Sequence, residues 1–327
     1  MNKIKWGIIG AGNISSSFAT ALNSLKDAEI VGVAARDKKR AEEFCEKYNG
    51  EKAFGSYEEL ATDPDIQVVY IGTLHPYHYE HAKLCLEHGK DVLCEKPFTL
   101  NEKTSKELMD IAEEKKVFLM EAMWTKFLPT TKKVKEWIDS GKIGNVRYIY
   151  GDFGFQHEYD ENHRLFQLEK GGGALLDLGI YPITYAVHMI GTIPKNIKSS
   201  VVMGKAKTDE INTVLMEFEH GVTANLTSAS TVATGTDVTI IGDQGKIVVP
   251  NFWMAQEARL LSLDGNVKEH FKGFHQINGY EYEAMEVMEC IQQGKLESDL
   301  LPHKDTLAIM KIMDSLRKDW GLIYPGE

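Results

Sequence analysis

A glycine-rich turn near the start of the chain has the residue types and spacing to hold a pyrophosphate. It reads Gly10-Ala11-Gly12-Asn13-Ile14-Ser15. Gly10 permits a tight turn and Gly12 lets the backbone approach a phosphate, while Asn13 and Ile14 open a helix whose free N–H groups face the anion. Ser15 replaces the third glycine of the usual fingerprint and is still small. The turn joins a predicted strand to a predicted helix, so it indicates dinucleotide binding more than an ordinary glycine turn.

Charged residues at the end of the next predicted strand bear on the choice of dinucleotide. Glu29–Ala34 is followed by Ala35-Arg36-Asp37. A carboxylate at this place binds the ribose 2′-OH of NAD, whereas an arginine suits the 2′-phosphate of NADP. Arg36 has the expected position, Arg40 lies one helical turn later, and Asp37 is interpreted as the N-cap of a helix. The pattern favours NADP, with NAD as the alternative.

A lysine follows another predicted strand, Asp91–Cys94, in the sequence Glu95-Lys96-Pro97. Pro97 disfavours helical geometry at Lys96 and so keeps it extended. Lys96 is therefore expected at the carboxyl edge of a parallel sheet, where such sheets bind ligands, with Glu95 beside it lining the cofactor. A cation there could polarise a substrate oxygen and lower the pKa of a neighbouring hydroxyl. The alternative is a surface lysine in a loop.

The loop Thr73-Leu74-His75 follows the predicted strand Val68–Ile71 and is expected to line the cofactor. His75, His78 and His81 have a spacing that suggests a metal site. Pro76 makes one unbroken helical face through all three unfavourable. Hydride transfer between carbon atoms also needs no metal, so we predict none.

The elements that must position these residues divide the chain into two patterns. Up to about residue 122, short apolar runs alternate with amphipathic segments, which predicts an α/β, doubly wound parallel sheet of the Rossmann type. From residue 123 to 327, several strands follow one another without intervening helices, which predicts an α+β domain with an open, mostly antiparallel sheet. The predicted strands of this second domain are Val146–Phe155, Ile197–Gly204, Thr213–Phe218, Thr223–Ser228 and Val238–Ile241.

Composition excludes several classes of function. The 327 residues carry a formal net charge of -11, which argues against binding to nucleic acid or to an anionic membrane surface. No secretory apolar region and no run of about 20 apolar residues is evident. The four cysteines are scattered and are expected to be reduced, which is consistent with a cytoplasmic location. They are Cys45, Cys85, Cys94 and Cys290.

Three motifs in this order resemble the glucose–fructose oxidoreductase/inositol dehydrogenase/MocA (Gfo/Idh/MocA) family. They are Gly10–Ser15, Glu95-Lys96-Pro97 and the run Gly171–Tyr181, GGGALLDLGIY. The segment Glu121–Pro129, EAMWTKFLP, is similar to the branch of dimeric dihydrodiol dehydrogenases, which also oxidise D-xylose with NADP. That branch usually has arginine at the position of Lys126.

The resemblance implies roles for individual residues. Lys96 and Tyr181 match the catalytic lysine and the tyrosine base, and Asp177 matches the acid that precedes the tyrosine. Residues of the substrate pocket by family position are Trp124, Phe155 and Arg164. The family also implies a homodimer or dimer of dimers through the second sheet. Asp177 and Tyr181 would share one helical face unless Pro182 breaks the helix.

The expected reaction is hydride transfer between a polyol, sugar or dihydrodiol and NADP or NAD, with Tyr181 taking the hydroxyl proton beside the Lys96 cation. A reductase of a keto-sugar or related carbonyl would use the same residues in the opposite direction. A cofactor-sensing regulatory protein without turnover is a third alternative, since a fold does not fix a function.

Overall fold

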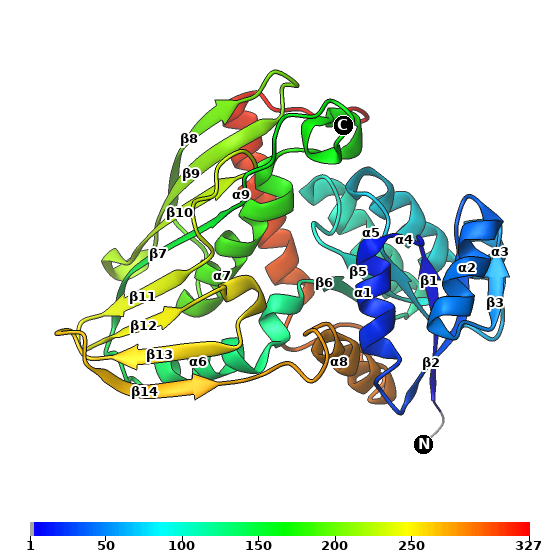
Figure 1. Ribbon diagram of the computed structural model, residues 1–327, viewed down its shortest axis with the longest axis horizontal. Helices are drawn as coiled ribbons and strands as arrows, with labels where there is room; N and C mark the ends of the chain where they lie inside the picture. Colours follow the sequence, from blue (N-terminus) through cyan, green and yellow to red (C-terminus); the bar gives the residue numbers. More distant parts are fainter. Residues whose placement is uncertain (1–2) are drawn as a thin grey trace. The chain divides into compact units, whose positions relative to one another are not determined.

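The computed structural model describes residues 3–327, which form two compact units (Figure 1). The first unit is the chain up to Trp124 together with Gln276–Met310, and the second is Thr125–His275 together with Lys311–Glu327. The sequence-based division placed all of 123–327 in one domain. Residues 276–310 instead return to the first unit, where helix α8 (Glu281–Gln292) packs against helix α1 (Asn13–Leu22). Helix α9 (His303–Trp320) contributes to both units.

The first unit contains a six-stranded parallel sheet in the order β3-β2-β1-β4-β5-β6. The order reverses between β1 and β4, and ligands bind open α/β sheets beyond the carboxyl ends of the strands at such a point. Its strands are β1 (Ile4–Ile9), β2 (Ala28–Ala34), β3 (Lys52–Phe54), β4 (Val68–Ile71), β5 (Asp91–Glu95) and β6 (Leu119–Ala122). The connecting helices are α1, α2 (Lys38–Tyr48), α3 (Tyr57–Thr62), α4 (His78–Glu87) and α5 (Glu102–Lys115).

The predicted Rossmann class is confirmed, and its strands bury almost every side chain. β4 is buried at all four positions, and β1 is buried at every position except Lys5. Burial on both faces is what a parallel sheet covered by helices requires. The sequence did not indicate β3 and α3, because a three-residue strand and a six-residue helix are too short to show a period.

The second unit contains an eight-stranded sheet in the order β14-β13-β12-β11-β7-β10-β9-β8. All neighbouring strands are antiparallel except β7 and β10, which are parallel. The strands are β7 (Val146–Gly154), β8 (Asn196–Met203), β9 (Asp209–Glu217), β10 (Thr223–Ala229), β11 (Val238–Gly242), β12 (Lys246–Val249), β13 (Glu257–Leu261) and β14 (Val267–Lys272). The expected mostly antiparallel sheet is confirmed, and the last three strands were not predicted.

Two helices accompany this sheet; the sequence did not indicate the first of them, and for the second it indicated only a helix around Tyr181 that Pro182 would break. They are α6 (Pro129–Asp139) and α7 (Ile180–Ile190). A π-helical turn, Leu175–Gly179, runs directly into α7, and both residues at the junction, Gly179 and Ile180, have right-handed helical dihedral angles. Pro182 therefore does not end the helix, because helical geometry continues from the π-helical turn through Pro182 to Ile190.

One helical stretch, Leu168–Ile190, is long and apolar enough to cross a membrane by length and composition. Its 18-residue window is 83% buried inside the protein. Core helices of water-soluble proteins have the same property, so this stretch is weak evidence for a membrane span.

We expect Gly10→Ala to destabilise the first unit by about 1–3 kcal/mol, since Gly10 has a φ of +98° and an added Cβ would lie 2.9 Å from the Gly72 carbonyl oxygen. Urea unfolding followed by circular dichroism measures the loss. Gly12→Ala is the matched control, because nothing lies within 4 Å of its Cβ position. It should cost at most about 1 kcal/mol. Equal destabilisation by both substitutions would contradict the steric explanation.

Candidate functional site

The glycine turn leaves the start of helix α1 available to an anion. Gly12 caps α1 without a side-chain hydrogen bond, and the first turn carries no acidic residue. The space where a Cβ of Gly12 would lie is open. Ser15 is fully buried, and its Oγ lies 2.3 Å from the position of a Cβ on Gly72 at the end of β4. The third fingerprint position thus packs strand against helix, the first allows the tight turn, and the second leaves the room that a pyrophosphate requires.

Two exposed arginines follow β2. Arg40 Nη2 donates to the Ala11 carbonyl at 2.9 Å, which ties helix α2 to the glycine turn. Arg36 and Arg40 both act electrostatically on Tyr57, whose pKa is raised by burial and held down in part by these two cations. Asp37 accepts from Lys39 N–H at 3.0 Å and caps α2, which confirms its interpretation as an N-cap. The donor set therefore fits a phosphate monoester beside the ribose.

His78 connects the loop after β4 to the turn after β5. It is fully buried, with Nδ1 2.9 Å from the Pro97 carbonyl oxygen and Nε2 3.1 Å from the Thr73 carbonyl oxygen. His81 Nδ1 lies 3.0 Å from Thr73 Oγ1, and burial lowers the pKa of His81 to about 4. These ring nitrogens lie within hydrogen-bond distance of protein atoms, and two of them contact Thr73 in the loop expected to line the cofactor. His75 opens the 3₁₀ helix His75–Tyr77 that follows Leu74.

Lys96 leaves the carboxyl end of β5 from a turn that is fixed by buried groups. Glu95 is 5% exposed, and it accepts from the Tyr70 hydroxyl at 2.6 Å and from the Lys96 main-chain N–H at 3.2 Å. Phe98 N–H donates to Glu121 Oε1 at 3.1 Å. Lys96 itself is half-buried. The main chain of Lys96 is therefore held at the strand end and does not belong to a flexible surface loop.

Tyr181 belongs to a cluster of aromatic rings in the second unit. It is 6% exposed and packs edge-on against Phe153, with ring centroids 5.1 Å apart. Trp253 lies 5.4 Å from Phe153 and 6.4 Å from Tyr181 by centroid, and Phe155 also contacts both Phe153 and Trp253. Trp253 was not among the residues predicted from the sequence. The run Phe252-Trp253-Met254 between two strands was the available signal.

Asp177 and Arg164, two separate candidates from the sequence, form an ion pair. Arg164 Nη2 lies 2.8 Å from Asp177 Oδ2. The Asp177 side chain is 9% exposed, whereas that of Arg164 is 38% exposed. The pair joins a buried carboxylate near Tyr181 to a guanidinium that solvent or a polar ligand can reach.

A buried aspartate supports the glycine run that precedes Asp177. Asp209 Oδ2 accepts from Leu175 N–H at 2.7 Å and from Asn212 Nδ2 at 2.9 Å. Gly173 has a φ of +119°, and a Cβ there would lie 2.2 Å from Asp209 Oδ1. The Tyr324 hydroxyl donates to the Gly172 carbonyl at 2.7 Å. Glycine is thus required at position 173, because Asp209 approaches it too closely for a side chain.

Trp124 ends the first unit's main segment and is 2% exposed. It stacks on Tyr280 with centroids 4.4 Å apart. The candidates thus divide by unit. The glycine turn, Arg36, Arg40, Thr73–His75, Glu95, Lys96 and Trp124 belong to the first unit, and Phe155, Arg164, Asp177 and Tyr181 belong to the second.

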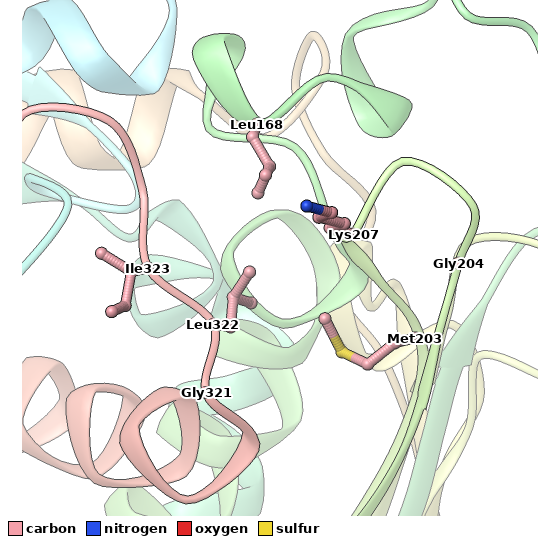
Figure 2. Close-up of a pocket in the computed structure, with 7 residues that line it drawn as sticks. All are labelled: Leu168, Met203, Gly204, Lys207, Gly321, Leu322 and Ile323. Atoms are coloured by element: carbon pink, nitrogen blue, oxygen red, sulfur yellow. The ribbon is translucent and has the colours of Figure 1, made fainter.

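One open cavity of about 330 Å³ lies in the second unit (Figure 2). None of its lining residues is a candidate from the sequence. The close-up shows the Lys207 amine beside Leu168, with Met203 and Leu322 on other sides. The remaining lining residues are Gly204, Gly321 and Ile323.

Comparison with known proteins agrees with this architecture. Residues 4–123 match the model of an oxidoreductase family with an NAD-binding Rossmann fold, GFO_IDH_MocA, and residues 131–248 match the C-terminal domain of the same family. The match to an oxidoreductase family with an NAD-binding Rossmann fold identifies the class as an NAD(P)-dependent oxidoreductase. The chain belongs to the Gfo/Idh/MocA family.

Relatives and solved structures are similar over nearly the whole chain. The chain is 36% identical to the trans-1,2-dihydrobenzene-1,2-diol dehydrogenases of Mus musculus and Homo sapiens, each match covering 99% of both chains. KijD10, a 3-ketoreductase from Actinomadura kijaniata in complex with NADP and TDP-benzene, is 24% identical with a TM-score of 0.86, covering 97% of this chain and 98% of that one. An aldose-aldose oxidoreductase from Caulobacter crescentus is 19% identical with a TM-score of 0.88, covering 97% of both chains.

The free energy of unfolding should depend on pH through Asp209, which accepts a hydrogen bond from the Gly171–Tyr181 run. Burial raises the pKa of Asp209 to about 7, so its folded form keeps a proton that the unfolded chain releases near pH 4. The stability from this proton is therefore lost as the pH rises from about 4 through 7. In Asp209→Asn, which cannot titrate, we expect the unfolding free energy to fall less over that range, by up to about 4 kcal/mol. Urea unfolding at pH 4.5, 6 and 7.5 measures this difference. Parallel pH profiles would contradict the prediction.

Proposed function

We propose that the protein is an NADP-dependent dehydrogenase of a small polyol, sugar or dihydrodiol, with Lys96 and Tyr181 as its catalytic residues. The observation that carries the proposal is the place of Lys96. It follows β5, the neighbour of β4, and the strand order reverses on the other side of β4, between β1 and β4. The main-chain N–H of Lys96 donates to the buried Glu95. A lysine fixed there is preorganised to stabilise negative charge on a reacting oxygen.

The proposed cofactor site uses the first unit's own donors. Gly10, Gly12, Asn13 and Ile14 would hold the pyrophosphate, and Arg36 with Arg40 would hold a 2′-phosphate. The loop Thr73-Leu74-His75 and the pair Glu95 and Lys96 would line the remainder of the cofactor. A bound NADP⁺ supplies the acceptor for hydride.

The proposed chemistry of the protein's residues is proton transfer with electrostatic support. Tyr181 takes the hydroxyl proton of an alcohol substrate as general base, and Lys96 stabilises the developing alkoxide charge. Asp177, held by Arg164, orients the substrate or the tyrosine. In the opposite direction the same residues would reduce a carbonyl, and the likeness to a 3-ketoreductase keeps this as the second candidate reaction. A cofactor-sensing regulatory protein that catalyses no reaction would not need Lys96, Tyr181 or Asp177.

The aromatic rings beside Tyr181 bear on the substrate class. Phe155 and Trp253 offer flat apolar surface, and the Arg164–Asp177 pair offers polar contacts. A ring with one apolar face and adjacent hydroxyls has both features, and a cyclic dihydrodiol satisfies this description better than an acyclic polyol. The named activity of the mouse and human relatives is of this kind.

We further propose that the protein forms a homodimer or dimer of dimers through the eight-stranded sheet, and that it works in the cytoplasm. Exposed apolar side chains on β7, β8 and β9 support the interface, because large apolar residues on a sheet face favour a partner. They include Tyr150, Val202 and Leu215. The four cysteines are buried and form no disulfide within residues 3–327, as a reducing compartment requires.

The central test is turnover of a panel of aldoses, inositols and dihydrodiols with NADP, followed by absorbance of the reduced cofactor. One class should be oxidised. Lys96→Met and Tyr181→Phe should each lower kcat/KM by about a thousandfold, because each removes a group that acts in the transition state. Circular dichroism controls for folding. A folded Lys96→Met protein with wild-type turnover would rule out the catalytic role of the lysine.

Arg36→Ala should raise the Kd for NADPH by about tenfold to a hundredfold and leave the Kd for NADH nearly unchanged, because only the former has a 2′-phosphate for the guanidinium. Titration by cofactor fluorescence gives both constants. Lys39→Ala, which removes an exposed cation at the start of the helix that follows Arg36, is the matched control. Equal weakening of both cofactors in Arg36→Ala would assign Arg36 a purely structural role.

A further inference from the structure

A buried tyrosine that follows helix α9 contacts the glycine run that leads to Asp177. Tyr324 is 1% exposed, and its hydroxyl donates to the Gly172 carbonyl at 2.7 Å. The same hydroxyl oxygen lies 3.4 Å from the position that a Cβ on Gly173 would have, so it packs directly against the run. Burial raises the pKa of Tyr324 well above its usual value, so the hydroxyl keeps the proton that it donates.

Gly172 packs against the short helical segment that carries Arg164. The main-chain N–H of Gly172 donates to the Gln167 carbonyl at 3.0 Å. A Cβ on Gly172 would lie 2.5 Å from the Arg164 carbonyl oxygen, so only glycine allows this approach. The ion pair of Arg164 with Asp177 joins residues on the two sides of this contact. The length of the ion pair therefore depends on where Gly172 lies.

The segment that carries Tyr324 is itself held by a buried arginine of α9. Arg317 is 4% exposed, and its two terminal nitrogens donate to the two carboxylate oxygens of Glu327 at 2.7 and 2.9 Å. It also donates to Asp314 at 2.7 Å, and its guanidinium lies 5.1 Å from the centre of the Tyr324 ring. Glu327 accepts in addition from Tyr324 N–H at 2.9 Å. A bidentate pair of this kind fixes geometry as well as charge, so it holds the main chain of Tyr324 in one place.

We propose that Tyr324 is a positioning residue for the Arg164–Asp177 ion pair, and that Arg317 and Glu327 hold Tyr324 in place. The hydroxyl fixes the Gly172 carbonyl and thereby keeps the two partners of the ion pair together. The catalytic consequence rests on the proposed function, in which Asp177 orients the substrate or the tyrosine base. Small displacements of such an orienting group lower the rate, because the reacting atoms are then less often aligned.

Hydrogen exchange tests the structural part of the proposal without turnover. Gly173 N–H donates to the Leu165 carbonyl at 2.9 Å, so exchange of this amide reports whether the turn stays closed. In Tyr324→Phe, the amides of residues 171–176 should exchange about tenfold faster than in wild type, because the Gly172 carbonyl loses its buried donor. Strand β10 should exchange at its wild-type rate. Mass spectrometry of peptic fragments measures both.

Two further variants accompany the exchange experiment. Glu327→Gln weakens the ion pair with Arg317, so it should speed exchange over residues 171–176 by a smaller factor than Tyr324→Phe. Tyr79→Phe is the matched control, because it removes a tyrosine hydroxyl that donates to Glu107 at 2.7 Å in the first unit. It should leave the exchange of residues 171–176 at the wild-type rate.

A double-mutant cycle tests the positioning role. Tyr324→Phe should lower kcat/KM by about tenfold and leave the Kd for NADPH unchanged, because the proposed cofactor donors belong to the first unit. In a protein that already carries Asp177→Ala, the same substitution should have almost no further effect, because the carboxylate through which Tyr324 acts is gone. Tyr79→Phe should keep the wild-type kcat/KM.

The opposite outcomes each contradict a defined part of the proposal. Unchanged exchange of residues 171–176 in Tyr324→Phe would overturn the tyrosine as the support of the glycine run. Losses of kcat/KM that simply add in the Tyr324→Phe, Asp177→Ala double variant would overturn its action through the ion pair. If no panel compound is turned over, the exchange result still decides whether Tyr324 holds the run, and the failure then belongs to the proposed activity.

Discussion

Main-chain groups in a buried turn need hydrogen-bond partners, because water cannot replace those that a sheet would have supplied. The turn from Glu95 to Phe98 meets this requirement with two side chains from elsewhere in the first unit and one of its own. His78 faces the Pro97 carbonyl, Glu121 accepts from Phe98 N–H, and Glu95 accepts from Lys96 N–H. The position of the lysine, and with it any chemistry at the sheet edge, depends on these three contacts.

The second unit solves a similar problem with a buried carboxylate. The glycine run before Asp177 approaches Asp209 too closely for any side chain at Gly173, and Asp209 satisfies Leu175 N–H in return. The chain then continues through a π-helical turn into α7, which presents Tyr181 to an aromatic cluster. π-Helical turns are frequent at functional sites, where they change the direction of side chains. In both units, therefore, buried carboxyl groups accept hydrogen bonds from main-chain N–H groups of the segment that leads to a candidate catalytic residue.

Several features of the fold and the site could be predicted because each depends on a short stretch of sequence. The glycine turn, the strand runs of the Rossmann sheet and the capping role of Asp37 follow from local periodicity and residue type. The strands β12 and β13 could not, because runs of four and five residues are too short to show a clear period, and in β14 the charged Glu269 has a half-buried position where alternation would place an apolar residue. The short β3 and α3 failed for the same lack of a measurable period.

Sequence by itself determined the Rossmann class, the family and the residue types with chemical potential, since these depend on local pattern and on motif order. Only tertiary structure decided which of them meet. It paired Arg164 with Asp177, brought Trp253 to Tyr181 and returned residues 276–310 to the first unit. Contacts between residues of different elements leave no local signal, because they arise from burial of whole elements against one another. The charge state of a buried acid follows from those contacts and therefore cannot be obtained from its position in the chain.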